Sequence, residues 1–514
     1  MTDASQAAAN ARGGGDPRVG GFMQPAGFSW ALFEFARNPY FMLIVTYVFP
    51  PYFAQFVVGD PVQGQATVAE ATKWAGVIGA LTAPVLGAMM DRGGARKPVM
   101  LLFLAMLFVS GLSLWWSMPG SVDAQGVFHP PADGLGVYGT MAFLVLGFVG
   151  YTYSEMMHNA MLRTAGRPDA LSQISGAGIG LGQLSSALCL GGVVVVALTA
   201  GYLGTAEGGY VLQRGAGPFM AVWLALFVLP FFLYTPDGAP AGGSWSTAAR
   251  DVLSKDGKLN PIGAALGVFA YLRGLFREFP EAMKYLLACL IFKDGIIALL
   301  AIGGVFSTGV LGWGLEEGGI YGIWASIFGA IGGLWLAPLL DRAMGPRKAI
   351  MAQLAALCVV VMIALGTTQQ SILYGLVPAG GKLHGLGLFD TLPDVFYMSM
   401  TAFIAALAAA NIAASRYMIV TLAPKDRVAE FYGLFAMSST ATVWLGPLLI
   451  EWATRTFNDQ RIGFSPILLL LAGGLALMFT LKPTTGAKGR LEFETPPAAT
   501  PQGEEPESRN GLSM

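Results

Sequence analysis

Gly-Ala-Met-Met-Asp-Arg-Gly-Gly-Ala-Arg-Lys, residues 87–97, joins two long apolar runs, 68–90 and 98–118. A similar stretch, Ala-Pro-Leu-Leu-Asp-Arg-Ala-Met-Gly-Pro-Arg-Lys, occupies residues 337–348, again between apolar runs. In each copy the Asp-Arg pair lies where its carboxylate can approach a helix N-terminus or a guanidinium. The recurrence predicts two similar halves; the alternative is that two unrelated basic loops arose from the general charge bias of membrane proteins. The residues concerned are Gly87, Asp91, Arg92, Arg96 and Lys97, and then Asp341, Arg342, Arg347 and Lys348.

The composition excludes a set of soluble domains. Hydrophobic residues make up 54% of the 514 residues and charged residues 12%, and the mean hydropathy is +0.59. Too few polar side chains are available to cover a water-facing surface, whereas many apolar runs reach the roughly 20 residues that span a bilayer as a helix. The composition therefore predicts an all-α, polytopic membrane protein that is embedded in a lipid bilayer.

Twelve transmembrane helices are predicted, arranged as two pseudo-symmetric six-helix halves. In the first half they cover residues 28–57, 68–90, 98–118, 136–162, 172–200 and 217–234. In the second half they cover residues 283–311, 318–340, 348–366, 392–422, 428–453 and 463–481. Both halves begin with a long apolar run, and the Asp-Arg loop follows the second run in each.

The distribution of lysine and arginine predicts that both termini are cytoplasmic, because cytoplasmic loops carry an excess of these residues. The predicted organisation is a disordered tail (1–27), the first half (28–235), a cytoplasmic linker (236–282), the second half (283–481) and a second disordered tail (482–514). Within the linker, large apolar residues recur at helical spacing over residues 261–279, which predicts an amphipathic helix in the membrane interface. We expect the protein to lie in a bacterial inner membrane.

Charged and polar residues interrupt four of the predicted spans, namely the first helix of each three-helix repeat. Such groups are costly inside a bilayer and normally face a cavity or a partner. The spacing i, i+3, i+4 places those of the first span on one helical face. The residues are Glu34, Arg37 and Asn38 in the first span, Glu155, His158 and Asn159 in the fourth, Lys293 and Asp294 in the seventh, and Asn411, Ser415 and Arg416 in the tenth.

Three roles remain open for these residues: an inner gate or structural ion-pair network, direct contact with substrate, and proton coupling. Alignment of the first and seventh spans places Glu34 opposite Lys293 and makes Asp294 the nearest candidate partner of Arg37. We therefore expect ion pairs between the two halves.

Several short blocks resemble a known family. The 87–97 loop resembles the loop between helices 2 and 3 of the major facilitator superfamily. The stretch Trp-Ala-Leu-Phe-Glu-Phe-Ala-Arg-Asn at 30–38, with Phe-Pro-Pro-Tyr-Phe at 49–53, is similar to the first-helix signature of the family that includes the fungal vacuolar amino-acid effluxers. Further similar blocks lie at 159–162, 175–178, 292–295, 303–305, 415–416 and 429–433. The chain departs from the family pattern at Arg37, where the family has Asn, and at Lys293, where the family has a neutral polar residue.

The resemblance implies a secondary active transporter of the major facilitator type that moves a small polar solute, such as an amino acid or small carboxylate, by efflux. The two additional cations favour an anionic group on the substrate, although pairing with Glu34 and Asp294 would also account for them. Alternatives are a drug or lipophile efflux transporter, and a non-transporting protein that delivers pigment or assists assembly. We expect a monomer with a small-molecule substrate and a coupling proton.

No enzymatic role is expected. The sequence has no Gly-x-x-x-x-Gly-Lys-Ser/Thr loop for a nucleotide. The three cysteines lie singly inside apolar runs, which indicates neither a disulfide framework nor a metal site. We predict no cofactor, no metal and no nucleic-acid partner.

Overall fold

The computed structural model describes residues 21–482 except 93, 168–170, 238–242, 248–253, 256–257, 260–271, 386, 423–430, 432–433 and 436–442. The described helices belong to one compact unit, Met1–Leu481. The rest of the chain, Lys482–Met514, forms a second unit, of which Lys482 alone is described. Both predicted tails lie almost entirely outside the described residues.

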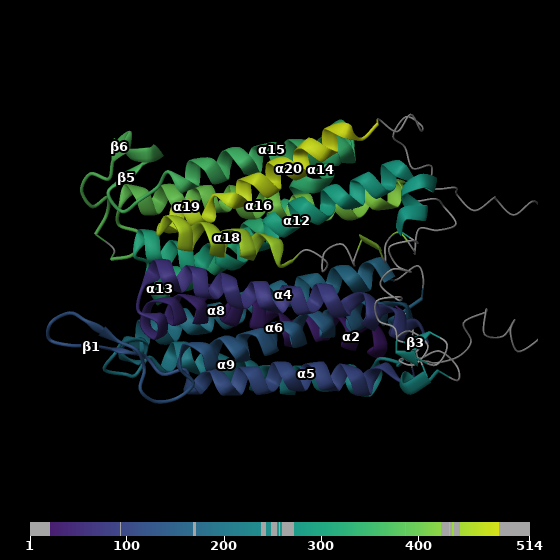
Figure 1. Ribbon diagram of the computed structural model, residues 1–514, viewed down its shortest axis with the longest axis horizontal. Helices are drawn as coiled ribbons and strands as arrows, with labels where there is room; N and C mark the ends of the chain where they lie inside the picture. The colour runs from purple at the N-terminus through teal and green to yellow at the C-terminus, as the bar shows by residue number, and fades with distance from the viewer. Residues whose placement is uncertain are drawn as a thin grey trace, which may run out of the picture. The chain divides into compact units, whose positions relative to one another are not determined.

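The helices of the first half lie together in the lower part of Figure 1. They begin with α2, which continues through a π-helical stretch (Phe41–Tyr47), α3 and a second π-helical stretch (Phe53–Val58). The elements are α2 (Pro25–Tyr40), α3 (Phe49–Tyr52), α4 (Pro61–Arg92), α5 (Arg96–Ser113), α6 (Gly136–Ala160), α7 (Leu162–Ala165), α8 (Leu171–Thr199) and α9 (Val211–Tyr234).

The helices of the second half lie in the upper part of the same view. Its first span also ends in a π-helical stretch, Ser307–Leu311, as the first span of the other half does. The elements are α12 (Pro280–Phe306), α13 (Leu315–Ile331), α14 (Ala337–Met344), α15 (Pro346–Leu365), α16 (Leu392–Leu422), α18 (Leu445–Phe457), α19 (Gln460–Phe464) and α20 (Pro466–Thr480).

Within the described residues, ten helical segments are long and apolar enough to cross a membrane. The two remaining predicted spans correspond to α4 and to the segment that ends in α18, most of whose first part is not described. Of the predicted amphipathic linker helix, the structure describes a helical turn at 272–278, and the rest lies outside the described residues. Chain order and helix positions thus agree with the predicted spans.

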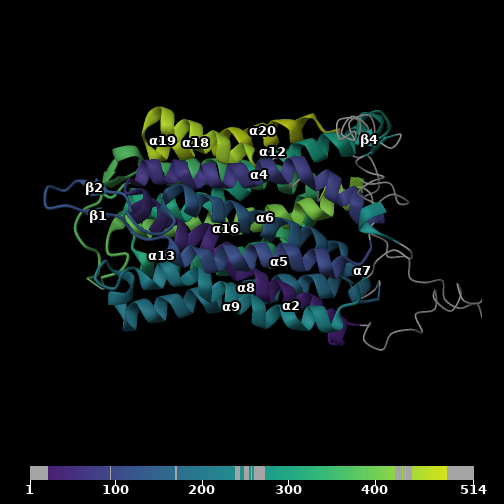
Figure 2. The same ribbon diagram turned by 60° about the horizontal axis from the view of Figure 1, so that its bottom comes forward.

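Three short hairpins mark the two ends of the bundle. β1 (Ser121–Val122) pairs with β2 (Phe128–His129), and β5 (Ser371–Ile372) pairs with β6 (Val377–Pro378). Figures 1 and 2 place both hairpins at the same end, which we call the hairpin end, whereas α7 and the third hairpin, β3 (Ser254–Lys255) with β4 (Lys258–Leu259), lie at the opposite end. We call this opposite end the basic end, because α5 begins there at Arg96.

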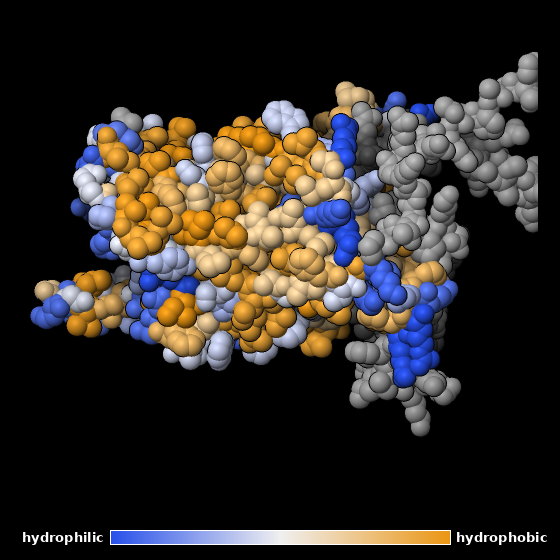
Figure 3. All heavy atoms as spheres, turned by 90° about the horizontal axis from the view of Figure 1, so that it is seen from above, coloured by the Kyte–Doolittle hydropathy of each residue, from blue (hydrophilic) through white to orange (hydrophobic). Residues whose placement is uncertain are grey.

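An apolar surface surrounds the helices. Figure 3 shows hydrophobic residues over most of the face between the two ends, with hydrophilic residues gathered near the ends. Large apolar side chains are exposed at levels that a water-soluble protein would not tolerate over so wide an area. They include Leu81, Leu101, Leu102, Val195, Leu198, Leu226, Leu229, Leu233, Leu334, Trp335 and Leu469. This surface is that of a multi-pass integral membrane protein.

The first spans of the two halves cross without a side chain between them. The π-helical stretch Phe41–Tyr47 contacts α12, and a methyl group built on Gly304 would overlap the backbone carbonyl of Thr46. Glycine permits such close backbone approach between helices in lipid. Any larger residue at this position would push the two halves apart.

Candidate functional site

A buried ion-pair cluster lies between α2 and α6 in the first half. Arg37 extends one guanidinium nitrogen to Oε2 of Glu34 at 2.8 Å and the other to Oε2 of Glu155 at 3.3 Å. The Arg37 side chain is 3% exposed, and that of Glu155 is 46% exposed. One cation thus joins two carboxylates, of which one is enclosed and the other remains accessible.

Tyr151 on α6 completes the surroundings of Arg37. Its ring centroid lies 4.1 Å from the guanidinium carbon, a cation–π arrangement, and its backbone carbonyl accepts a hydrogen bond from Nη1 at 3.4 Å. The planar guanidinium suits this double role, because it can stack on a ring while its edge donates to carboxylates. The prediction that Arg37 pairs with Asp294 of the other half is wrong for this structure.

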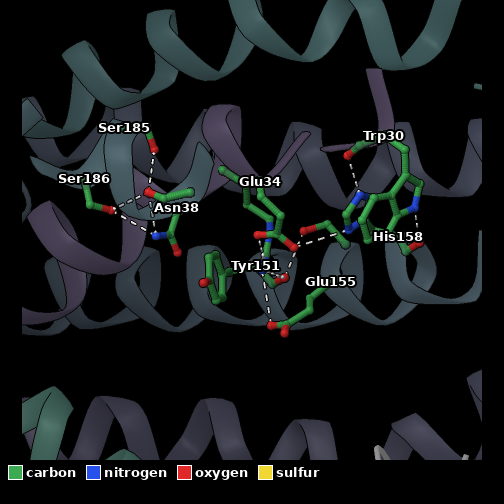
Figure 4. Close-up of polar contacts among 11 residues, drawn as sticks. Trp30, Glu34, Asn38, Tyr151, Glu155, His158, Ser185 and Ser186 are labelled. Atoms are coloured by element: carbon green, nitrogen blue, oxygen red, sulfur yellow. Dashed lines mark hydrogen bonds and ion pairs between the residues drawn. The ribbon is translucent and has the colours of Figure 1, made fainter. Parts of the chain in front are cut away.

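His158 on α6 is fully buried against α2. Its Nε2 lies 2.9 Å from the carbonyl oxygen of Trp30, and its Nδ1 lies 3.3 Å from Oε1 of Glu34 (Figure 4). The imidazole is stacked between the rings of Trp30 and Phe33, with centroids 4.0 Å and 4.3 Å away. The Trp30 indole in turn donates to the carbonyl of His158 at 3.0 Å. The ring is therefore fixed by contacts on both faces and at both nitrogens.

Asn38 does not join this cluster. Its amide donates to the carbonyl of Gly182 and to Oγ of Ser186 on α8, each at 2.9 Å. Figure 4 shows Asn38 on the α8 side, away from Glu155 and His158. The common helical face predicted for Glu34, Arg37 and Asn38 is present, but Asn38 serves the α2–α8 contact.

In the second half, Lys293 and Asp294 are buried and have separate surroundings. The Nζ of Lys293 lies 3.4 Å from the ring centroid of Phe435, and Glu155 of the first half lies within its electrostatic range. Asp294 accepts a hydrogen bond at Oδ2 from the backbone of Gly446 at 2.7 Å, while its Oδ1 has no hydrogen-bond partner among the described atoms. The predicted contact between Glu34 and Lys293 is not formed, because both oxygens of Glu34 face Arg37 and His158 instead.

The polar residues of the tenth span are partly buried and partly exposed. Asn411 and Ser415 are buried, with Ser415 donating to Asn411 and Asn411 donating to Gln353 of α15, both at 3.5 Å. Arg416 on α16 and Asn159 on α6 are exposed. The buried Asn411 links α16 to α15 through Gln353, and Ser415 bonds to Asn411 within α16.

The side chains of Gly87, Asp91 and Arg92 lie outside the described residues. The two basic residues that follow are described: Arg96 and Lys97 donate their backbone amides to the two carboxylate oxygens of Asp237, at 2.5 Å and 3.0 Å. Asp237 thereby caps the first turn of α5 and ties the linker to this loop.

In the second copy of the loop, Arg347 donates to carbonyls at the end of α20, at 3.3 Å and 3.4 Å. Oδ1 of Asp341 has no hydrogen-bond partner among the described atoms, and Arg342 is exposed. Lys348 lies in the first turn of α15. The two copies thus occupy equivalent places without sharing contacts.

Sequence reasoning missed a polar network between α4 and α18, which belong to different halves. Lys73 pairs with Glu451 at 2.5 Å, and Arg455 pairs with Glu70 at 2.7 Å. Nearby, Gln65 donates to Thr454 and to the carbonyl of Gln460. The signal was present, because Glu70 and Lys73 interrupt one apolar run and Glu451 and Arg455 another at helical spacing.

Among the described residues no group of three or more His, Cys, Asp and Glu could hold a metal ion. The described cysteines are free: Cys189 and Cys289 are buried and Cys358 is half-buried.

Comparison with known proteins places this geometry in context. Residues 153–490 match the sequence model of a family described as "Vacuole effluxer Atg22 like". Among curated proteins, "Autophagy-related protein 22" of Cryptococcus neoformans var. neoformans serotype D (strain B-3501A) is 21% identical over 322 residues, which cover 63% of this chain and 55% of that protein. The protein of the same description from Yarrowia lipolytica (strain CLIB 122 / E 150) is 22% identical over 358 residues, covering 68% and 56%. The chain spans about half the length of these relatives.

Solved structures share the fold at low sequence identity. The inward-open xylose transporter XylE from E. coli superposes with a TM-score of 0.57 at 13% identity, covering 90% of this chain and 96% of that chain. The nucleoside transporter NupG gives a TM-score of 0.54 at 10% identity, covering 89% and 98%. These values show a common architecture of two six-helix halves.

Proposed function

The chain belongs to the Atg22-like vacuole effluxer family and is a membrane transporter of the major facilitator type, and on this premise we propose that it exports a small polar solute by alternating access. The observation that carries the proposal is the ion-pair cluster of Glu34, Arg37 and Glu155. Charges buried at this depth would be a liability in a passive scaffold, since each costs several kcal/mol to place in a bilayer. A non-transporting partner protein would have no use for them.

The contacts between the halves support alternating access. The α4–α18 network joins the halves on the side of the hairpin end, and Gln55 also donates to the carbonyl of Thr308 across the halves at 3.5 Å. Polar pairs of this kind can separate when the other access state forms. We propose that the hairpin end faces away from the cytoplasm and that both termini are cytoplasmic, in accord with the basic residues at the opposite end.

The solute we propose is an amino acid or a small carboxylate. The family description supports efflux as the direction. The cations Lys293 and Arg416 support a preference for an anionic group on the solute. Arg416 is exposed. Lys293 lies within electrostatic range of Glu155, the accessible carboxylate of the cluster. A solute carrying both an amino group and a carboxylate could engage both charges. Asn159 lies exposed on the same helix as Glu155.

The sequence and the relatives point to different membranes for this protein. A bacterial inner membrane was the expectation from the sequence, whereas the curated relatives come from fungi and the family description names the vacuole. The apolar surface is compatible with any bilayer of ordinary thickness. The expectation of a bacterial inner membrane therefore conflicts with these relatives, and cell fractionation would decide between it and an intracellular membrane.

Counterflow in proteoliposomes tests the proposal. Vesicles loaded with an unlabelled amino acid or carboxylate should accumulate the labelled form of the same solute, and Arg37→Met should abolish this accumulation. Arg461→Met, at the hairpin end, is the matched control and should transport normally. Transport of lipophilic cations that is unaffected by Arg37→Met would favour drug efflux. No counterflow of any solute would favour a non-transporting partner.

A further inference from the structure

The start of the linker lies against the basic end of the first half. α9 ends at Tyr234, and the hydroxyl of the next residue, Thr235, lies 2.8 Å from the hydroxyl of Ser29 on α2. The carbonyl of Pro236 accepts a hydrogen bond of 3.0 Å from the hydroxyl of Thr164 on α7. Two neighbouring linker residues are thus bonded to two different elements of the first half.

Asp237 joins the linker to a third element, the beginning of α5. Its two carboxylate oxygens accept the backbone N–H groups of Arg96 and Lys97. The N–H groups in the first turn of a helix have no acceptor within the helix, so these two depend on Asp237 for a partner. The negative charge is also favourable beside the positive end of the helix dipole. In addition, Nζ of Lys97 donates to the carbonyl of Phe232 at 2.7 Å, near the end of α9.

Further along, the linker contacts the Asp-Arg loop itself. The indole of Trp245 donates to the carbonyl of Ala95 at 2.7 Å. A methyl group built on Gly94 would lie 3.0 Å from the carbonyl oxygen of Gly243 and 3.6 Å from the α-carbon of Ser244. The two backbones therefore pass close to each other. These contacts are made to the first copy of the loop that recurs in the two halves.

The elements that the linker joins here also carry the buried ion-pair cluster. Ser29 precedes Glu34 on α2 by little more than one helical turn. α7 follows directly after α6, which carries Glu155. A displacement of α2 relative to α7 at the basic end would therefore be passed along both helices to the cluster.

Opening these linker contacts would leave polar groups without partners. Thr235 is 1% exposed, and its hydroxyl would lose both Ser29 and the carbonyl of Ala26. The N–H groups at the start of α5 would lose both oxygens of Asp237. A buried polar group that loses its hydrogen bond keeps the cost of its desolvation, so the closed arrangement is favoured.

We propose that residues 235–237 and 243–245 form a strap that stays closed throughout the transport cycle, so that the linker moves with the first half as far as Trp245. The second half is then tethered at the Asp-Arg loop, through Ala95, and not at the end of α9. All hydrogen bonds of the described strap residues lie within the first half or the strap, so relative motion of the halves breaks none of them. The inference rests on the proposed transport function for the cycle, whereas the closed strap stands on its contacts.

A disulfide tests whether the strap stays closed. Gly94→Cys and Ser244→Cys are combined in a chain whose native cysteines, Cys189, Cys289 and Cys358, are replaced by alanine. We expect an oxidant to cross-link the pair in membranes and solute counterflow to continue at the parent rate. The two single-cysteine variants, treated with the same oxidant, are the controls.

Two results of this experiment would overturn the proposal. Failure of the pair to cross-link would mean that the strap does not lie on the loop. Counterflow that stops on oxidation and returns with a reductant would mean that the strap opens during each cycle. If the parent protein moves no solute, the proposed function fails, and the cross-link still decides whether the strap is closed.

Hydrogen exchange tests Asp237 as a positioning residue. Asp237→Ala should speed exchange of the Arg96 and Lys97 amides by up to about tenfold, the factor for one net hydrogen bond. It should also slow solute turnover at unchanged KM, because a loosened strap lengthens the connection between the halves without touching the solute. Asp237→Asn should lie between, because its single amide oxygen replaces two acceptors.

The chain offers a matched control for this variant. Asp123 also accepts two backbone N–H groups, those of Gln125 and Val127, but in the β1–β2 turn at the hairpin end. Asp123→Ala should leave both the exchange at Arg96 and the turnover unchanged. Parent rates of exchange or of turnover in Asp237→Ala would show that the strap does not position the start of α5.

Discussion

Lys73 on α4 and Glu451 on α18 form an ion pair of 2.5 Å that joins the two halves, with side chains 13% and 12% exposed. A pair so enclosed behaves differently from a surface salt bridge, since removal of one partner leaves a charge with little water around it. Under the proposed alternating access, the pair would break when the hairpin end opens. It therefore contributes to the balance between the two access states.

The first prediction concerns this pair. Glu451→Met should destabilise the described state by up to about 3–5 kcal/mol, the usual range for breaking a buried pair from one side. Lys73→Met should cost less, because Glu451 keeps Arg455 at 3.3 Å. The double variant should recover much of the loss, because no lone charge remains. Thermal unfolding of the two single variants and the double variant measures the coupling. Additive losses would mean that the two residues do not interact in the membrane.

The second prediction concerns Arg37, which bridges Glu34 and Glu155. Arg37→Met should lower the melting temperature strongly and abolish transport, because two carboxylates lose their shared cation. Arg37→Lys should restore the charge without restoring function, because an ammonium group cannot donate to both carboxylates while stacking on Tyr151. Normal solute transport by Arg37→Lys would show that charge alone matters at this position.

The third prediction separates Glu34 from Lys293. In the described state Glu34 binds Arg37 and His158, so the effects of Glu34→Gln and Lys293→Met on unfolding free energy should add to within about 0.5 kcal/mol. Partial rescue in the double variant would instead indicate that the two residues meet in the opposite access state. Chemical unfolding in detergent gives the comparison.

These residues show what the sequence could and could not predict. The spacing of Glu34 and Arg37 correctly placed them on one face, because helical periodicity fixes rotation about the helix axis. It does not fix which neighbouring helix that face meets, and for this reason the predicted pairs with Lys293 and Asp294 are not formed in this structure. The stacking of His158 between Trp30 and Phe33 depends on how closely α6 approaches α2, which no local pattern encodes.

The span boundaries were easier to predict. Hydrophobic runs set the length of each helix directly, and the predicted span at 392–422 has the same limits as α16. The Asp237 cap of α5 was missed, because it joins residues about 140 positions apart in the sequence. Contacts of this kind follow from the fold. They have no recognisable local signal in the sequence.

The fourth prediction concerns the Asp-Arg loops. Asp91→Asn should slow transport without unfolding the protein, since we expect the pairing of this loop to help hold one access state. Asp341→Asn should have a smaller effect, because the second copy of the loop, to which Asp341 belongs, departs further from the family pattern. Initial transport rates at matched protein amounts give the ratio. Rates equal to the parent in both variants would reduce the loops to signals for topology.

The fifth prediction concerns orientation. Tags at Gly15 and Gly511 should both report the cytoplasm, and a tag at Gly126 should report the opposite side. Gly126 is suited to insertion, because it lies in the β1–β2 turn with φ of 79° and has no neighbouring atoms within 4 Å of an added Cβ. Labelling with a membrane-impermeant reagent in intact cells or vesicles tells the sides apart. Termini on opposite sides would require an odd number of spans.

The close crossing of Gly304 and Thr46 has a mechanical consequence. Two backbones already in contact cannot move closer to each other. We therefore expect this crossing to stay nearly stationary and to act as a pivot, around which the rest of each half tilts. Small displacements at the hairpin end would then produce opposite displacements at the basic end. The position of the pivot along the helices would set the ratio of the two displacements.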